Sequence, residues 1–172
     1  MDWVHPLVYD YIWSVFLTGI EIINSNAFNL VGDIGATNAR FALVEPGSSE
    51  IKNIENLKCS DFEDIQSAIK FYLSNHSDLD IQSACFATAG TVHLDIFKLA
   101  NNHWVINKQE VKKTLKGITV KWINDFTAQA FATTTLSDSE TIVINKGVVE
   151  PEKLRLVIGP GTGLGVCGLI MS

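Results

Sequence analysis

The hydrophobic pattern of this chain consists of short apolar runs and amphipathic stretches, separated by turn-forming residues. Two runs, 28–32 and 40–44, flank a turn of small residues and are predicted to be strands. Alternating or continuous apolar character predicts further strands at residues 51–57, 81–89, 118–123, 154–158 and 164–170. The first three strands are expected to form an antiparallel meander, because only turns separate them.

Helical spacing of apolar side chains predicts helices at residues 60–73, 107–115 and 125–134. The first is expected to start at a capping box made by Ser60 and Glu63. The second is expected to have Asn107 and Glu110 as reciprocal caps and Gly117 at its exit.

The order of these elements is typical of an α/β fold with a mixed sheet. Antiparallel strands come first, and strands separated by helices follow, which is the connection that parallel strands require. Residues 91–99 are expected to form a hairpin or an irregular excursion. Residues 136–153 are polar and turn-rich, and they predict a domain boundary before the last two strands.

Residues 1–29 have a different pattern and are interpreted as an N-terminal extension. Apolar side chains recur at helical spacing up to Phe16, which predicts an amphipathic helix. The apolar run 11–20 is too short to span a bilayer and lacks the features of a signal peptide. The helix is expected to pack on the body of the chain or on a second copy, so a homodimer is one expected assembly. A membrane-surface role is the alternative.

The composition is that of an ordinary globular protein, and its charge argues against two classes of partner. Of the 172 residues, 47% are hydrophobic and 19% are charged, and the formal net charge is −6. Nucleic acids and anionic membranes attract basic surfaces, so neither is expected as the main partner. The three cysteines are far apart and lie in apolar runs, which favours buried thiols in a reducing, cytoplasmic compartment.

The turn at residues 32–38 is the first candidate binding element. Gly32, Gly35 and Ala36 leave backbone N–H groups unobstructed, so that phosphate oxygens could approach closely. Asp33 adds an oxygen that could hold Mg²⁺ directly or through water. Three further side chains could donate hydrogen bonds to the same anion: Thr37, Asn38 and Arg40. The alternative is a β-hairpin that needs its glycines for positive φ, with Asp33 in an Asx turn.

Asn124 and Asp125 form the second candidate element, because they end a predicted strand and open a predicted helix. Open α/β sheets bind ligands outside the carboxyl ends of their strands. A carboxylate there could accept the proton of a hydroxyl that attacks phosphorus. The alternative is that Asp125 is only the N-cap of the helix.

The glycine-rich segment Gly159–Gly165, with Gly161–Gly163 at its centre, is the third candidate element. Its N–H groups and the Thr162 hydroxyl could wrap a phosphate, or the segment could be a plain hairpin. Asn101 and Asn102 are either turn formers or ligands of hydroxyl groups.

Taken in order, these stretches resemble the bacterial-type glucokinase family, within the superfamily of hexokinases and actin-like ATPases. Residues 30–40 resemble its first phosphate motif, and residues 157–165 resemble its second. Residues 84–90 and 99–104 resemble the stretch that leads into the sugar cleft, and residues 122–128 resemble the catalytic segment. The resemblance keeps its register over most of the chain, so it is far more specific than a single glycine turn.

The resemblance implies a ribonuclease-H-like domain at residues 30–136. The extension 1–29 would precede it and has no counterpart in the family. Residues 137–172 would then form a linker and the opening hairpin of a second, similar domain.

The resemblance also implies ATP-dependent phosphorylation of glucose at its 6-hydroxyl, a step of glycolysis. ATP and Mg²⁺ would be the cofactors, and glucose or a related hexose would be the partner. Asp125 would be the catalytic base, with Asn101 and Asn124 holding sugar hydroxyls, and Asp33 would lie near the metal. The residues implied in cradling ATP are Gly32, Asp33, Ile34, Gly35, Ala36, Thr37, Asn38, Gly161, Thr162 and Gly163.

The chain departs from the family pattern at three positions and in length. Ala36 stands where glycine is usual, Thr91 where proline is usual, and Ala100 where threonine is common. The resemblance covers the first half of such a kinase, without the Glu-Gly-Gly-His type sugar segment or the adenosine-binding part. We therefore expect weak or no activity from the chain alone. The alternatives are a non-catalytic sugar- or nucleotide-binding module and an interaction domain.

Overall fold

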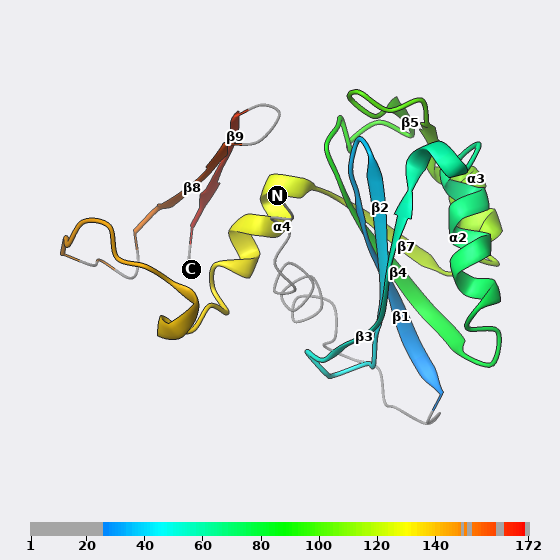
Figure 1. The fold of residues 1–172 in the computed structure, drawn as a ribbon, viewed down its shortest axis with the longest axis horizontal. Helices are drawn as coiled ribbons and strands as arrows, with labels where there is room; N and C mark the ends of the chain where they lie inside the picture. Colours follow the sequence, from blue (N-terminus) through cyan, green and yellow to red (C-terminus); the bar gives the residue numbers. More distant parts are fainter. Residues whose placement is uncertain (1–25, 149, 151–152, 161–163, 171–172) are drawn as a thin grey trace.

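The computed structural model of the chain describes residues 26–148, 150, 153–160 and 164–170 (Figure 1). The strands are β1 (Ala27–Ile34), β2 (Asn38–Val44), β3 (Ile51–Lys58), β4 (Asp80–Thr88), β5 (Ile96–Lys98), β6 (Val105–Asn107), β7 (Thr119–Asn124), β8 (Arg155–Pro160) and β9 (Leu164–Leu169). Five of them form one sheet in the order β3-β2-β1-β4-β7, and two-stranded sheets are formed by β5–β6 and β8–β9. The helix predicted near the N-terminus lies outside the described residues.

The five-stranded sheet is mixed, as the sequence predicts. β1 pairs antiparallel with β2, and β2 pairs antiparallel with β3. On the other side, β1 pairs parallel with β4, and β4 pairs parallel with β7. The α/β class and the opening meander are therefore confirmed.

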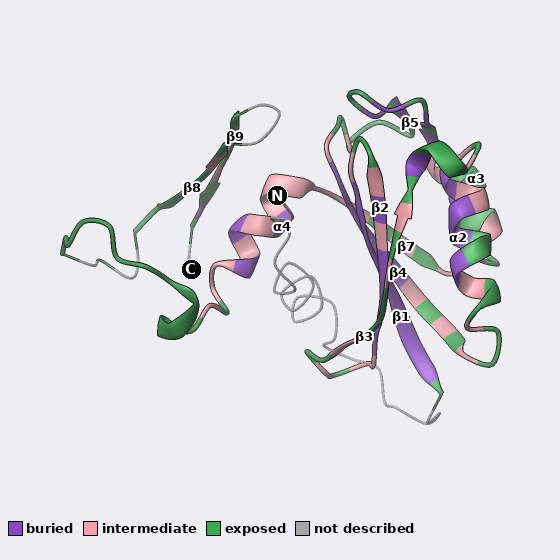
Figure 2. Cartoon of the chain, in the orientation of Figure 1, coloured by how far each residue is buried: buried purple, intermediate pink, exposed green. Residues whose placement is uncertain are grey.

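Helices α2 (Ile65–Ser74) and α3 (Lys108–Thr114) cover one face of the sheet (Figure 1). The core beneath them is built on aromatic side chains that are fully buried. Figure 2 shows β1 as a buried strand at the centre of the sheet. Phe41 packs on Tyr72 with ring centroids 5.5 Å apart, and it meets Phe86 edge-on at 6.3 Å. Burial of each such side chain contributes roughly 1.5–3 kcal/mol, so this cluster fixes the face of the sheet that α2 covers.

Helix α4 (Asp125–Ala132) lies on the opposite face of the sheet (Figure 1). It packs through Ala128 and Ala132 against Cys85 and Ala87 of β4. Because these side chains are small, the helix backbone can approach the sheet closely. The hairpin β8–β9 packs against α4 on the side away from the sheet.

The predicted start of the first helix is wrong. Residues Cys59–Asp61 form a 3-10 turn, and α2 begins at Ile65 with Asp64 as its N-cap. The Ser67 N–H donates to Asp64 Oδ1 at 2.7 Å, and Ser67 Oγ accepts from the Asp64 N–H at 3.3 Å. The physical reason is tertiary: the Cys59 N–H donates to the Thr37 carbonyl at 2.9 Å, so the chain stays tied to the β1–β2 hairpin before it can enter the helix.

The second helix has the N-cap and exit that the sequence predicts, whereas the predicted reciprocal cap from Glu110 is wrong, because the Glu110 carboxylate pairs with Lys113 instead. Asn107 Oδ1 accepts from the N–H groups of Gln109 and Glu110, at 3.1 and 3.3 Å. The Glu110 carboxylate accepts from Lys113 at 2.8 Å. Gly117 has a φ of +83°, and its N–H donates to the Lys112 carbonyl at 2.8 Å, which ends the helix as a C-terminal glycine does.

The segment between β4 and α3 forms the hairpin that was one of two predicted outcomes. Its strands, β5 and β6, pair antiparallel from Ile96↔Asn107 to Lys98↔Val105. The second strand lies beyond the predicted range 91–99. Within the described part of the chain, the helices are all too short or too polar to cross a membrane.

Candidate active site

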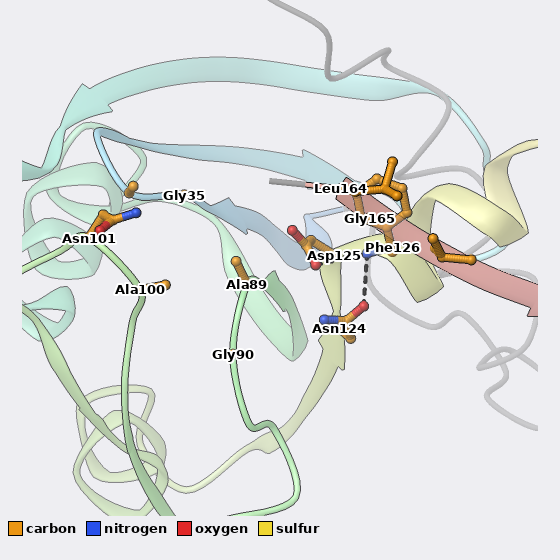
Figure 3. A pocket seen from close by; sticks show the side chains of 12 residues that line it. Gly35, Ala89, Gly90, Ala100, Asn101, Asn124, Asp125, Phe126, Leu164 and Gly165 are labelled. Atoms are coloured by element: carbon orange, nitrogen blue, oxygen red, sulfur yellow. Dashed lines mark hydrogen bonds between the residues drawn. The ribbon is translucent and has the colours of Figure 1, made fainter. Parts of the chain in front are cut away.

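The carboxyl ends of β1, β4 and β7 meet at one edge of the sheet. Ile34 pairs in register with Thr88, and Thr88 pairs with Asn124, so the last residues of these strands form one row. Next to this row lies a cavity of about 660 Å³ (Figure 3). It is lined by Gly35, Ala36, Ala89, Gly90, Ala100, Asn101, Asn124, Asp125, Phe126, Leu164, Gly165 and Val166. Its volume and its place in the sheet are typical of a small-molecule site.

The first predicted binding turn is a short hairpin. Its two strands extend further toward the turn than the sequence predicts. β1 continues to Ile34 and β2 starts at Asn38, so the connection is residues 35–37. The Gly35 N–H donates to the Asn38 carbonyl at 2.9 Å and closes the hairpin. Gly35 and Ala36 line the cavity, and Thr37 is exposed beside them. The other predicted phosphate-binding residues of this region lie within the strands: Gly32, Asp33, Ile34 and Asn38.

The β-hairpin of the alternative interpretation is confirmed, but the two features expected within it, glycines with positive φ and an Asx turn at Asp33, are wrong. Neither Gly32 nor Gly35 has a positive φ. A β-carbon on Gly32 would lie 2.7 Å from the Phe86 ring, and one on Gly35 would lie 3.2 Å from the Asn38 carbonyl oxygen. Both glycines therefore serve close packing, and Asp33 pairs with Arg40 instead of forming an Asx turn.

Asp33 is a buried carboxylate near the end of β1. Arg40 Nη1 donates to Asp33 Oδ2 at 3.1 Å, across the register pair that the two residues form. Burial raises the pKa of Asp33 above its ordinary value, the Arg40 guanidinium opposes that rise, and the Asp125 carboxylate adds to it. A further cation near Asp33 would stabilise its ionised form.

The surroundings of Asp33 suit Mg²⁺ better than they suit a metal ion whose ligands all come from the protein. Mg²⁺ usually takes one or two carboxylates and keeps water or phosphate oxygens as its other ligands. Asp33 and Asp125 supply two carboxylates, and the Asp125 charge is close enough to raise the pKa of Asp33. A divalent ion carrying its own water and phosphate ligands would offset their repulsion.

Asn124 and Asp125 have different roles at the start of α4. Asn124 Oδ1 accepts from the N–H groups of Phe126 and Thr127, at 3.0 and 3.3 Å, so Asn124 is the N-cap. The alternative that Asp125 is only the N-cap is therefore wrong. The Asp125 carboxylate accepts from the Phe126 N–H at 2.9 Å and faces the cavity (Figure 3). A carboxylate in this place can take a proton from a hydroxyl bound in the cavity.

Asn101 and Asn102 are adjacent but lie in different environments. Asn101 is exposed, has a φ of +56° and lines the cavity on the side of Gly35 (Figure 3). Asn102 is 8% exposed, and both ends of its amide are bonded to backbone groups. Both residues thus form the turn, Asn101 through its backbone and Asn102 through its side chain, and Asn101 is the one that a ligand in the cavity can reach.

The second predicted phosphate segment, Gly161–Gly163, lies outside the described residues, between β8 and β9. These two strands pack on α4 through Phe126. β-carbons on Gly159 and Gly165, which are register partners, would lie 2.7 and 1.8 Å from the nearest Phe126 ring atoms. The ring therefore lies directly on this pair of glycines and fixes β8–β9 beside Asp125.

The cavity also contains residues that sequence reasoning did not single out as ligands. Ala89 and Gly90 follow β4 and line the cavity between Asn101 and Asn124 (Figure 3). The sequence feature that could have identified them is a pair of small residues at the end of a buried strand. Leu164 and Val166 enter from β9, and no local pattern predicts that contact.

The strand order and the cavity at the carboxyl edge define a ribonuclease-H-like domain of the kind that sugar kinases contain. A glucokinase structure from an Antarctic psychrotroph matches with a TM-score of 0.74 at 33% identity, covering 83% of this chain and 46% of that one. A ROK family glucokinase from Streptomyces griseus, in complex with glucose and AMPPNP, matches with a TM-score of 0.58 at 18% identity. That match covers 83% of this chain and 44% of that one, and it shows the fold alone.

The sequence profile described as Glucokinase matches residues 30–172, so the chain belongs to the glucokinase family. The family predicted from the sequence is confirmed. The glucokinase of Hahella chejuensis is 45% identical over 145 residues, which cover 84% of this chain and 45% of that relative. The chain thus spans less than half the length of the relatives that it matches.

Proposed function

We propose that the chain supplies the general base, the first phosphate hairpin and part of the sugar site for ATP-dependent phosphorylation of glucose. The position of Asp125 carries this proposal. Its carboxylate faces the cavity while Asn124 caps α4, so it is available for proton transfer. Gly35 and Ala36 line the same cavity from the end of β1.

In the proposed reaction the 6-hydroxyl oxygen of glucose attacks the γ-phosphorus of ATP. The new O–P bond forms as the bond to the ADP oxygen breaks, and Asp125 accepts the hydroxyl proton. Phosphoryl transfer depends mainly on positioning and on charge neutralisation. Asp125 supplies the positioned base, and the hairpin at residues 35–37 together with a bound cation would supply the positioning and charge neutralisation on the phosphate side.

The sugar is proposed to lie against Asn101, Asn124 and Asp125. Asn124 uses its side-chain oxygen for the helix cap, so its amide nitrogen is the group that remains to donate to a sugar hydroxyl. Ala89, Gly90 and Ala100 are small and leave room for a hexose ring in the cavity.

ATP is proposed to lie with its phosphates on residues 35–37, which the strand residues Gly32, Asp33, Ile34 and Asn38 hold in place. Gly161, Thr162 and Gly163 would complete the phosphate site from the β8–β9 connection. Asp33 would hold Mg²⁺, directly or through water, because the buried carboxylate gains from a nearby cation. When bound, the ion would neutralise phosphate charge during transfer.

We propose the same domain division that the sequence predicts: 30–136, then 137–172 as the start of a second domain. Its support is that β8 and β9 pair with each other and with no other described strand. A cytoplasmic protein in glycolysis, assembled as a homodimer, is the proposed setting. The described cysteines are free thiols, and burial raises the pKa of Cys85 to about 12, which suits a reducing compartment.

Calorimetric titration with glucose and with Mg²⁺–AMPPNP, together with an assay of glucose-dependent ADP release, tests this proposal. We expect binding of both ligands and weak ADP release that is lost in Asp125→Asn. Asp138→Asn is the matched control, because Asp138 is exposed and does not line the cavity. Absence of binding of either ligand would contradict the proposal. Binding without ADP release would favour a non-catalytic module.

A further inference from the structure

Asn102 forms a bridge between the two sides of the cavity. Its Nδ2 donates to the Gly35 carbonyl at 3.1 Å, and its Oδ1 accepts from the Trp104 N–H at 2.8 Å. The side chain is 8% exposed, so water competes little for either bond. One buried amide therefore links the hairpin after β1 to the loop between β5 and β6.

Each end of this bridge is anchored to the body of the fold. Trp104 is 1% exposed, and its indole N–H donates to the Phe62 carbonyl at 3.1 Å. On the other side, the Cys59 N–H donates to the Thr37 carbonyl at 2.9 Å, beside the Gly35 end. The Gly35 carbonyl also accepts from Cys59 Sγ at 3.7 Å, and the shorter bond from Asn102 is the one that connects the hairpin to the loop.

The bridged segments carry cavity-lining residues immediately next to the bonded groups. Gly35 and Ala36 lie at one end, and Ala100 and Asn101 lie at the other. In the proposed function these are the nucleotide-phosphate side and the sugar side.

We propose that Asn102 is a positioning residue that couples the sugar side of the cavity to the phosphate side. The inference rests on the proposed function for its ligand classes, a hexose and a nucleoside triphosphate. Binding of either ligand lowers the cost of ordering the segment that the other requires, so the effect is reciprocal. Asn102 touches neither ligand in this arrangement.

Asn102→Asp breaks one half of the bridge selectively. It keeps an oxygen that accepts from the Trp104 N–H, but it puts a second oxygen in place of the donor to Gly35. Asn102→Ser is the second variant, since it is neutral and too short to span both partners. Asn107→Asp is the matched control, the same change at a helix N-cap where Asp serves as well as Asn.

The first measurement is amide hydrogen exchange of the ligand-free chain. We expect exchange at residues 35–38 to rise roughly threefold to tenfold in both Asn102 variants, the range that loss of one hydrogen bond gives. Asn107→Asp is expected to leave those residues unchanged. Unchanged exchange at residues 35–38 in the Asn102 variants would overturn the bridge.

The second measurement is the Kd of Mg²⁺–AMPPNP with and without saturating glucose. In the wild type and in Asn107→Asp, glucose should tighten AMPPNP binding; in Asn102→Asp both ligands should bind, with a coupling factor of about one. An unchanged factor in Asn102→Asp, or a factor of about one in the wild type, would overturn the coupling. If the wild type binds neither ligand, the proposed function fails, and the exchange measurement still decides whether the bridge exists.

Discussion

The aromatic ring of Phe126 occupies the space that a side chain on Gly165 would need. A β-carbon on Gly165 would lie 1.8 Å from Phe126 Cε2, and other ring atoms would be almost as close. Phe126 directly follows Asp125, so this contact places β9 beside the proposed catalytic base. The contact joins the hairpin to the rest of the fold, and it can be broken without touching the sheet.

Gly165→Ala should detach the β8–β9 hairpin from α4. The added methyl group requires the ring or the hairpin to move, and overpacking of this kind typically costs about 1–3 kcal/mol. We expect faster amide exchange in β8 and β9, with β1, β4 and β7 unchanged. Gly147→Ala is the control, since nothing lies within 4 Å of the β-carbon it would add. Equal exchange in the two variants would show that the Phe126 contact does not hold the hairpin.

Asp33→Asn should remove a pH dependence of stability. Burial raises the folded-state pKa of Asp33 above its ordinary value of 3.8, so the folded protein holds this proton more tightly than the unfolded chain does. The stability that Asp33 contributes is full below the unfolded pKa and is lost as pH rises through the folded pKa. Urea unfolding across pH should show the wild type losing stability relative to the variant in that window. If the difference in unfolding free energy between the wild type and the variant stayed constant from acid to neutral pH, the raised pKa of Asp33 would be contradicted.

Asn124→Ala should destabilise the protein, whereas Asp125→Asn should not. Removal of an N-cap side chain costs about 1 kcal/mol, and Asn124 is the residue that caps α4. Asp125→Asn leaves that cap intact, so its effect should appear in phosphoryl transfer. Urea unfolding and ADP release, measured on both variants, separate the two roles. Equal loss of stability in both would mean that Asp125 shares the capping role.

Asp64→Ala should cost about 1 kcal/mol of unfolding free energy, because Asp64 is the N-cap of α2 and half of its capping box. Ser60→Ala is the matched comparison. The Ser60 hydroxyl donates only to the exposed Asp61 side chain, at 3.0 Å, so its loss should fall within about 0.5 kcal/mol. If Ser60→Ala instead lost more unfolding free energy than Asp64→Ala in denaturant unfolding, the capping box of Ser60 and Glu63 predicted from the sequence would be supported.

The strands of the sheet could be predicted from local pattern because they are short apolar runs bounded by turn-forming or polar residues. The run predicted at 81–89 is β4 at Asp80–Thr88, and the one at 118–123 is β7 at Thr119–Asn124. Buried apolar runs of this kind have few other stable arrangements. The positions of Asp125 and Gly35 at one edge then follow from parallel pairing.

The start of α2 and the environment of Phe126 could not be predicted in the same way. Two capping signals occur close together, Ser60 with Glu63 and Asp64 with Ser67, and local sequence favours neither. The bond from Cys59 to the β1–β2 hairpin makes the choice. Phe126 meets Gly165 only through tertiary packing, and Asn102 differs from Asn101 only in the direction that the fold gives its side chain.

The row Ile34–Thr88–Asn124 fixes the separation between β1 and β7 at this edge of the sheet. β4 supplies no residue to the cavity lining, yet it separates the strand that ends in the phosphate hairpin from the strand that ends at Asp125. Two strand spacings amount to about 10 Å, a length set by backbone hydrogen bonds and independent of side-chain identity. Substitutions within β4 can therefore change how stable the protein is, while the span between the two sides of the cavity stays the same.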